Sequence, residues 1–367
     1  MRVVAIIPEA FGGVGGIAQY CRDFLNALAG DRRINSVTVL PRIIRSHAEP
    51  QIGKIEHRIA GANGLGRFCR EVAHCALSGR SFDLVICGHI NLLPFAEVLR
   101  ARFGVPIVLL VYGSDAWQPT SRSLTNWLAR RVDAAVAISA FTMRRFASWT
   151  CLAASKQHIL PNAVHPEQFG IGPKPVDLLE RYNLMGRKVL VTLGRLSAVE
   201  RSKGIDRVIQ VLPQLLAKEP DLTYLVVGDG DDRLRLERLA EATGVSSRVV
   251  FAGYVAEEEK SRIYRLADAF VLAGKLEGFG FVLLEAMACG VPVVASKLDG
   301  SREAICDGAL GQLADPDDPA DLAAAILVAL QQPRQIPQRL ADFAYDRFCE
   351  RLSGILAEID QRVGVGA

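Results

Sequence analysis

The amino-acid sequence predicts an α/β protein with two doubly wound domains, each built on a parallel sheet. Short aliphatic runs alternate with longer amphipathic stretches along the chain, and parallel strands require such crossover helices between them. The alternation stops over residues 161–187, which contain four prolines, and then starts again. A chain of 367 residues is also longer than one ordinary domain.

The period of the apolar residues places the elements in order. In the first half the expected strands are 3–7, 37–40, 84–87, 107–111 and 134–138, and the expected helices are 16–28, 68–77, 94–102 and 123–131. In the second half the expected strands are 189–193, 224–227, 249–251, 269–272 and 291–294. We therefore expect domains at 1–165 and 166–345, and a C-terminal helix at 346–367 that packs back on the first domain.

Composition and charge argue against several classes of protein. No run approaches the ~20 apolar residues of a membrane-spanning helix, and the apolar run 3–7 ends at Pro8, too early for a signal peptide. The eight cysteines form no C-x-x-C pair, which favours a reducing, cytoplasmic compartment. Residues 1–165 carry 19 Lys/Arg and 10 Asp/Glu, or +9, and residues 166–367 carry 24 and 30, or −6. Different partners for the two halves and ordinary scatter of surface charge explain this asymmetry equally well.

A glycine cluster at residues 12–16 follows the first expected strand. The N-terminus of a helix beyond the carboxyl end of a strand suits an anion, because its backbone N–H groups point outward. Residues 13–18 also satisfy the G-x-G-x-x-A pattern of dinucleotide-binding domains, which makes a dinucleotide-dependent oxidoreductase the first rival function. However, Pro41 and Arg42 follow the second strand, where an acidic residue would hold a ribose. A phosphate site and a tight turn both fit the cluster.

Two further motifs carry the chemistry of the second half. Arg195 and Lys203 lie between its first strand and the next helix, where two cations can clamp a diphosphate. Glu277 lies in a glycine-rich loop and Glu285 in the helix that follows, eight residues later. A loop carboxylate can accept hydroxyl protons from a sugar, and a helical carboxylate can hold a ribose diol. The alternatives are a solvated basic turn and two unrelated carboxylates.

In this order the three motifs resemble glycosyltransferase family 4, a retaining family with the GT-B fold, in which two Rossmann-like domains face each other across a cleft. The likeness covers roughly residues 1–330 and includes L-P-N-A at 160–163 and G-D-G at 228–230. It implies an acceptor-binding first domain and a donor-binding second domain. It also implies that Arg195, Lys203 and Glu277 are catalytic. The implied donor-binding residues are Gly15, Gly16, Arg195, Lys203, Gly253, Tyr254, Val255, Glu277, Gly278, Phe279, Gly280, Phe281 and Glu285.

The resemblance implies a different role for each group of these donor-binding residues. Arg195 and Lys203 hold the diphosphate, Glu277 and the backbone of 278–281 contact the donor sugar, and Glu285 binds the ribose. The backbone of 253–255 reads the base, and Gly15 and Gly16 approach the diphosphate from the other domain. No metal or other cofactor is implied, and the D-x-D at 229–231 is expected to be a structural turn.

The sequence departs from the family pattern on the acceptor side. Tyr112 stands where family members often carry a histidine, so Tyr112, Asp115 and His89 are the acceptor-side candidates. For His89 the capping of a strand end is the alternative role. In addition, His165 replaces the aspartate that usually follows the L-P-N-G turn.

The implied reaction is retaining transfer of a hexose from a UDP- or GDP-linked sugar to a glycan or lipid-linked acceptor, in cell-surface polysaccharide or glycoconjugate synthesis. Nucleic acid is not an expected partner. Peripheral contact with anionic lipid at the inner membrane face is an option, because residues 122–149 interleave arginines with aromatics; buried aromatics with solvated arginines are the alternative. A sugar-nucleotide 2-epimerase and a non-catalytic nucleotide-sugar-binding protein are the further rivals.

Overall fold

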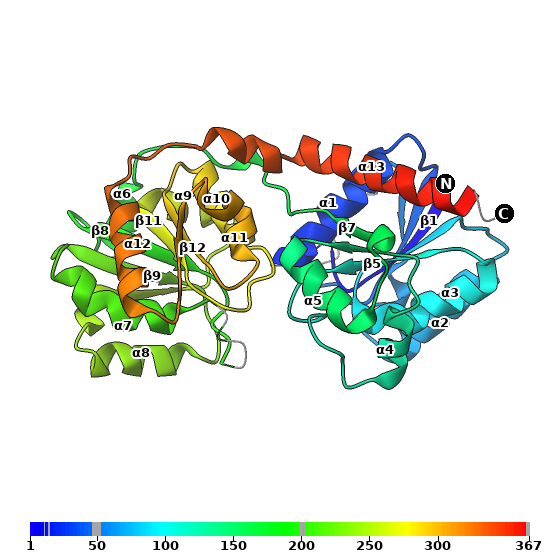
Figure 1. Ribbon diagram of the computed structural model, residues 1–367, viewed down its shortest axis with the longest axis horizontal. Coiled ribbons are helices and arrows are strands. Elements are labelled where there is room, and N and C mark those ends of the chain that lie inside the picture. Colours follow the sequence, from blue (N-terminus) through cyan, green and yellow to red (C-terminus); the bar gives the residue numbers. More distant parts are fainter. Residues whose placement is uncertain (11, 14, 46–52, 199–200, 202, 365–367) are drawn as a thin grey trace. The chain divides into compact units, whose positions relative to one another are not determined.

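The computed structural model describes the backbone of residues 1–10, 12–13, 15–45, 53–198, 201 and 203–364 (Figure 1). The chain divides into two units. The first unit comprises Met1–Ala163 and the C-terminal segment from Tyr345, and the second unit comprises Val164–Ala344. Each unit is a parallel α/β domain, so the predicted fold class is confirmed at the level of the single domain.

The first unit has a seven-stranded parallel sheet in the order β3-β2-β1-β4-β5-β6-β7. Its strands are β1 (Arg2–Ile7), β2 (Ser36–Pro41), β3 (Ile55–His57), β4 (Leu84–Cys87), β5 (Ile107–Val111), β6 (Ala134–Ala137) and β7 (Gln157–Ile159). Its α-helices are α1 (Gly16–Gly30), α2 (Leu65–Leu77), α3 (Leu93–Phe103), α4 (Ser123–Ala129), α5 (Ala140–Thr150) and α13 (Tyr345–Gly364). The central strands β4, β5 and β6 are buried along their whole length, which is why they appear in the sequence as continuous apolar runs.

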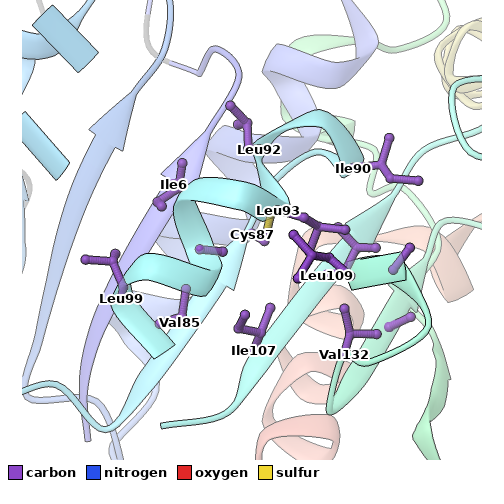
Figure 2. Close-up of a cluster of buried hydrophobic side chains, with 14 of the residues drawn as sticks. Ile6, Val85, Cys87, Ile90, Leu92, Leu93, Leu99, Ile107, Leu109 and Val132 are labelled. Atoms are coloured by element: carbon purple, nitrogen blue, oxygen red, sulfur yellow. The ribbon is translucent and has the colours of Figure 1, made fainter. Parts of the chain in front are cut away.

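A buried apolar cluster fixes the middle of this sheet (Figure 2). Leu93 and Leu99 of α3 pack with side chains of β4 and β5, among them Val85 and Leu109. Each fully buried aliphatic side chain contributes about 1.5–3 kcal/mol. The cluster therefore holds the carboxyl ends of β4 and β5 in place, and the acceptor-side candidates follow these two strands.

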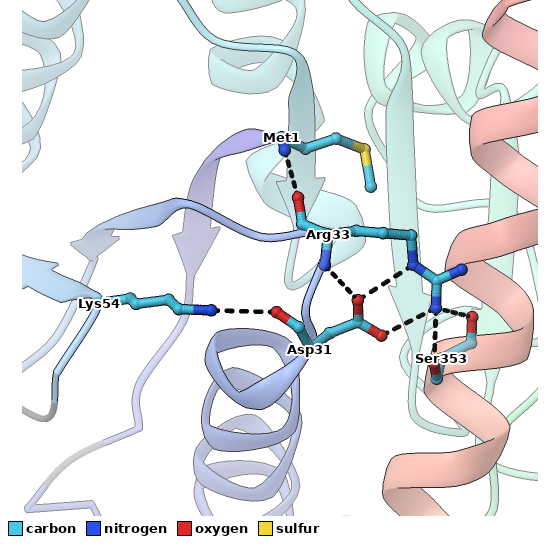
Figure 3. Close-up of polar contacts among 5 residues, drawn as sticks. All are labelled: Met1, Asp31, Arg33, Lys54 and Ser353. Carbon is cyan, nitrogen blue, oxygen red and sulfur yellow. Dashed lines mark hydrogen bonds and ion pairs between the residues drawn. The ribbon is translucent and has the colours of Figure 1, made fainter.

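The C-terminal helix α13 packs against α1 of the first unit. The ring of Phe348 lies edge-on to Tyr20, with the ring centroids 5.6 Å apart. Arg33 donates to the Asp31 carboxylate and, from the same guanidinium, to the carbonyl oxygen of Ser353 at 2.7 Å (Figure 3). Apolar packing and a charge-assisted hydrogen bond thus join the end of the chain to its beginning.

The second unit has a six-stranded parallel sheet in the order β10-β9-β8-β11-β12-β13. Its strands are β8 (Lys188–Leu193), β9 (Leu222–Val227), β10 (Val249–Gly253), β11 (Ala269–Leu272), β12 (Val293–Ser296) and β13 (Gln312–Ala314). Its α-helices are α6 (Val176–Arg181), α7 (Ile205–Leu216), α8 (Arg233–Ala242), α9 (Lys260–Leu266), α10 (Phe281–Ala288), α11 (Ser301–Ala304) and α12 (Pro319–Gln331). The strand order reverses between β8 and β11, and in the first unit between β1 and β4; ligands of such sheets bind outside the carboxyl ends of the strands at this point.

None of the helices that the structure describes has the length and apolar character needed to cross a bilayer. All eight cysteines are free thiols, and four of them, Cys21, Cys75, Cys87 and Cys289, are buried. Burial raises the pKa of the Cys21 and Cys87 thiols to about 12, so these two side chains act as small apolar groups.

Candidate active site

Glycines bring three loops into direct contact at the carboxyl end of the second sheet. Gly204 precedes α7 with φ of 70°, and a Cβ atom there would lie 1.9 Å from the carbonyl oxygen of Ala273, just after β11. A Cβ at Gly228, after β9, would lie 2.0 Å from the carbonyl oxygen of Gly194, after β8. Only glycine permits these approaches. The loops after β8, β9 and β11 therefore meet at the point where the strand order reverses.

Lys203 and Glu277 form an ion pair at this meeting point. Lys203 Nζ lies 2.5 Å from Glu277 Oε2, and the two side chains are 22% and 18% exposed. The stem of Lys203 crosses Gly194 so closely that a Cβ there would lie 2.9 Å from Lys203 Cε. The structure thus joins two of the predicted catalytic residues, which lie 74 positions apart in the chain.

Arg195 follows β8 and is exposed. Together with Lys203 it lines a hollow of about 10 Å³, which we call the cationic hollow. Its charged lining residues are Arg195, Arg201, Lys203, Asp206, Asp232 and Arg235. Arg201 and Arg235 are absent from the sequence prediction. Arg235 is bound to the Asp232 carboxylate at 2.6 Å, so part of the positive charge is offset within the protein.

The Glu277 loop is held by the loop after β12. Asp299 Oδ2 accepts the backbone N–H of Glu277 at 3.0 Å, and Gly300 donates its N–H to the carbonyl oxygen of Glu277 at 2.9 Å. Phe279 is buried against the ring of Phe343, with centroids 5.7 Å apart. The phenyl ring therefore faces the core, and of residue 279 only the backbone is available for the predicted contact with the donor sugar.

The other residues of this glycine-rich loop lead into α10. Gly280 is the residue before the helix and has φ of 91°, a left-handed conformation that favours glycine. Phe281 is the first residue of α10 and is partly buried. A Cβ at Gly300 would lie 2.0 Å from the carbonyl oxygen of Gly278, so this carbonyl points toward the β12 loop.

Glu285 lies inside the second unit. Its side chain is 2% exposed, Tyr264 donates its hydroxyl to Oε2 at 2.5 Å, and Lys260 Nζ lies 3.3 Å from Oε1. Burial raises the pKa of the Glu285 carboxyl, and the charge of Lys260 opposes this shift. In this conformation the partners of Glu285 are protein groups, and a ribose would have to replace Lys260 or Tyr264. The ribose-binding role remains a prediction.

The predicted base-reading turn follows β10. Gly253 ends the strand with φ of 75°, and its carbonyl oxygen accepts the N–H of Gly228 at 2.8 Å. Tyr254 is exposed and Val255 is partly buried. The turn thus borders the loop after β9 and offers an aromatic ring to solvent.

The glycine loop of the first unit leads into an open helix N-terminus. Gly15 has φ of 101° and precedes α1, and a Cβ at Gly15 or Gly16 would meet no atom within 4 Å. Arg22 of α1 donates to the carbonyl oxygens of Ala10 and Gly13 at 3.0 and 2.8 Å. Residues 11 and 14 of the predicted cluster lie outside the described residues. The arrangement suits an anion, and the tight turn also remains a valid interpretation.

His89 and Asp115 come together at the carboxyl ends of β4 and β5. His89 Nε2 lies 3.6 Å from Asp115 Oδ2, and the backbone N–H of Asn91 donates to His89 Nδ1 at 3.1 Å. Burial lowers the pKa of His89 and raises that of Asp115 to about 7. Tyr112 is buried, and its hydroxyl contacts Cys21 Sγ at 3.1 Å, so it is directed at α1 and not at this pair.

The aromatic rings of the arginine- and aromatic-rich segment 122–149 differ in how far they are buried. Phe146 is fully buried, and the partly buried Trp149 donates its indole N–H to Ala116. Trp127 is exposed, with the Arg131 guanidinium 4.6 Å from its ring centroid. The described part of the segment thus offers a single largely exposed indole, and contact with anionic lipid remains a prediction.

The D-x-D at 229–231 lies in a turn. Asp229 Oδ1 accepts the N–H of Gly230 at 2.8 Å, and Asp231 Oδ1 accepts the N–H of Ala198 at 2.9 Å. Within the described ranges, no three His, Cys, Asp or Glu side chains gather as a potential metal site. Asp229 thus stabilises its own turn after β9, and Asp231 holds the loop after β8.

Comparison with known proteins identifies the family of both units. Residues 14–168 match the model of Glycosyltransferase Family 4, and residues 180–347 match that of Glycosyl transferases group 1. The GDP-mannose-dependent alpha-(1-6)-phosphatidylinositol monomannoside mannosyltransferase of Mycobacterium tuberculosis is 34% identical over 358 residues, 89% of either chain. The protein of the same name from Mycolicibacterium smegmatis is 35% identical over 253 residues, which span 66% of this chain and 64% of the relative.

Solved structures show the same architecture. HepE of Anabaena, in complex with UDP and glucose, matches with a TM-score of 0.78 at 21% identity and covers 97% of this chain and 99% of its own. At a sequence identity of 21%, the similarity to this structure shows the fold alone. The oxidoreductase interpretation of residues 13–18 is wrong, because the glycosyltransferase match begins at residue 14 and so covers all but the first residue of that pattern. The chain is therefore a glycosyltransferase of family 4 with the GT-B fold.

Proposed function

We propose that the chain is a retaining mannosyltransferase that uses GDP-mannose and acts on a lipid-linked acceptor. The observation that carries the proposal is the Lys203–Glu277 ion pair beside the cationic hollow, at the carboxyl ends of β8 and β11. Such a place suits a nucleotide diphosphate. Two relatives, matched over 89% and 64% of their own lengths, are named as GDP-mannose-dependent enzymes that act on a phosphatidylinositol mannoside. These names favour GDP-mannose, and not a UDP-hexose, as the donor. They also favour a phosphatidylinositol-based lipid as the acceptor.

The proposed chemistry needs positive charge at the leaving group. When the bond between the anomeric carbon and the diphosphate breaks, negative charge grows on the departing oxygens, and fixed cations there lower the barrier. Arg195, Arg201 and Lys203, which line the hollow, supply that charge. The acceptor oxygen bonds to the anomeric carbon on the face that the diphosphate leaves, and its proton passes to a phosphate oxygen. Glu277 accepts hydrogen bonds from the donor sugar and holds Lys203.

An assay of mannose transfer to a lipid acceptor tests the proposal most simply. With GDP-mannose and phosphatidylinositol or its mannoside in mixed micelles, we expect a mannosylated lipid whose new linkage is α, and UDP-glucose should give much less product. Excess EDTA should leave the rate unchanged, because the proposed charge stabilisation uses side chains. A β linkage, or a rate abolished by EDTA, would contradict the proposal. Binding of GDP-mannose without transfer to any acceptor would indicate a non-catalytic binding protein.

On the acceptor side we assign His89 and Asp115 to the binding of the acceptor hydroxyl. His89 carries its proton on Nε2, because Nδ1 accepts from Asn91, and Asp115 Oδ2 lies 3.6 Å away. We expect His89→Gln to lower kcat/KM for the acceptor by about tenfold, with the donor KM unchanged. The exposed His74, whose Nδ1 contacts Arg58, gives the control His74→Gln, which should behave as wild type. Equal kinetics for both variants would exclude His89 from the site.

A further inference from the structure

Asp299 is a buried carboxylate that sits one loop away from the ion pair. It lies three residues after β12, its exposed fraction is 0%, and both of its carboxylate oxygens accept hydrogen bonds. Oδ2 accepts from the N–H of Glu277 at 3.0 Å, and Oδ1 accepts from the N–H and hydroxyl of Ser301 at 3.0 and 2.6 Å. Among the described residues these partners are neutral, so the buried charge has no counter-ion in contact.

A buried carboxylate without a counter-ion is unfavourable for folding. Burial raises the pKa of Asp299 to about 7, and the nearby charge of Glu277 acts in the same direction. Since this folded-state pKa lies above that of a free Asp, ionisation of Asp299 destabilises the fold. The loss is absent below about pH 4 and grows as the pH rises through 7. A residue that destabilises the protein at neutral pH is a candidate for a functional role.

The geometry shows which group Asp299 controls. Its carboxylate holds the N–H of Glu277, and the next residue, Gly300, donates to the carbonyl oxygen of Glu277 at 2.9 Å. A Cβ at Gly300 would lie 2.0 Å from the carbonyl oxygen of Gly278, so the two loops are in backbone contact. The peptide groups on both sides of Glu277 are therefore fixed, and its carboxylate is directed at Lys203.

We propose that Asp299 is a positioning residue, which fixes the backbone of Glu277 so that its carboxylate meets Lys203 and the donor sugar. The inference rests on the proposed role of Glu277 and adds to it the residue that sets its orientation. Asp299 makes no contact with substrate in this account. Catalysis is sensitive to such placement, since a displacement of about 1 Å at a reacting group can lower the rate about a hundredfold.

The substitution Asp299→Asn tests this role with little change in shape. One carboxamide oxygen cannot serve the N–H groups of both Glu277 and Ser301, so one of these two N–H groups loses its acceptor. We expect kcat to fall by about tenfold or more while the donor KM changes by less than about threefold. At about pH 8 the variant should lose little stability relative to wild type, because the buried charge is gone. A purely structural role would instead lower stability and leave kcat per folded molecule unchanged.

Asp133 provides the matched control. Its Oδ2 accepts the N–H of Ile107 at 2.8 Å, at the start of β5 in the first unit, and also pairs with Arg100 at 2.6 Å. Asp133→Asn therefore removes the charge of a carboxylate that holds a backbone N–H away from the site. Its kcat should stay within about twofold of wild type. If Asp299→Asn does not fold, Asp299→Ser shortens the side chain away from Glu277, and the same fall in kcat is expected.

The double variant Asp299→Asn/Glu277→Ala separates the inference from the proposed function. If Asp299 acts through Glu277, its substitution should add no further loss of kcat to Glu277→Ala. Normal turnover of Glu277→Ala alone would refute the proposed function. Loss of turnover in Glu277→Ala with a normal kcat in Asp299→Asn would overturn only the positioning role, and so would two losses that multiply in the double variant.

Discussion

Replacement of Glu277 by alanine is expected to lower kcat by about tenfold or more with the fold intact, and Lys203→Ala should do the same. The two side chains form one ion pair, 2.5 Å apart and about one-fifth exposed. Loss of either removes a contact to the donor and also leaves the partner charge unpaired at the site. Steady-state kinetics at saturating donor, with thermal unfolding followed by circular dichroism, measure the effect.

An ion pair at the other end of β8 is the control for this prediction. Lys188 Nζ lies 2.8 Å from Glu219 Oε2 at the opposite, amino-terminal end of β8. Lys188→Ala should therefore leave kcat within about twofold of wild type, since a partly exposed pair away from the site contributes only about 0–1 kcal/mol. Near-normal turnover of either Glu277→Ala or Lys203→Ala would contradict the proposed site.

Substitution of Gly204 by alanine is expected to destabilise the second unit by about 2–4 kcal/mol. The residue has φ of 70°, which disfavours any Cβ, and the added methyl carbon would lie 1.9 Å from the carbonyl oxygen of Ala273. Relief of that overlap requires α7 to move away from the loop after β11. The free energy of unfolding in urea measures the loss, and turnover should fall as well, because Lys203 precedes Gly204 directly.

Gly244 separates the two causes of this loss. It follows α8 with nearly the same φ, 71°, but a Cβ there would meet no atom within 4 Å. Gly244→Ala should therefore show the backbone term alone, about 1 kcal/mol. Equal losses in the two variants would show that the close approach of α7 to the β11 loop has no energetic weight.

Much of the fold can be predicted from this sequence because its strands are buried on both faces. The central strands of both sheets are nearly continuous apolar runs, and the helices between them are amphipathic, so the alternation is visible without a structure. The prediction lacks β3, β7 and β13, which have three residues each, because so short a segment shows no period. In a parallel sheet all carboxyl ends lie at one edge, so the sequence predicts that Lys203 and Glu277 lie at the same edge. The strand order, in which β8 is next to β11, then brings the two residues together.

The side-chain partners inside the site depend on loop paths and cannot be predicted in this way. Asp299 and Glu277 are 22 residues apart on different loops, and no local pattern indicates that one holds the other. In the same way, no sequence pattern indicates that Arg201 and Arg235 line the cationic hollow. The partners of Glu285 could not be predicted because α10 is apolar on nearly all sides. Such a helix has no polar face in its sequence, so nothing indicates that this carboxylate faces Tyr264 and Lys260.

Calorimetric titration with GDP-mannose tests the central claim, that the carboxyl edge of the second sheet binds a nucleotide sugar through Lys203 and its neighbours. We predict that the wild-type protein binds this donor, that Lys203→Ala weakens binding by about tenfold or more, and that Lys188→Ala does not change it. Absence of binding by the wild type, or equal affinities of all three proteins, would contradict the account.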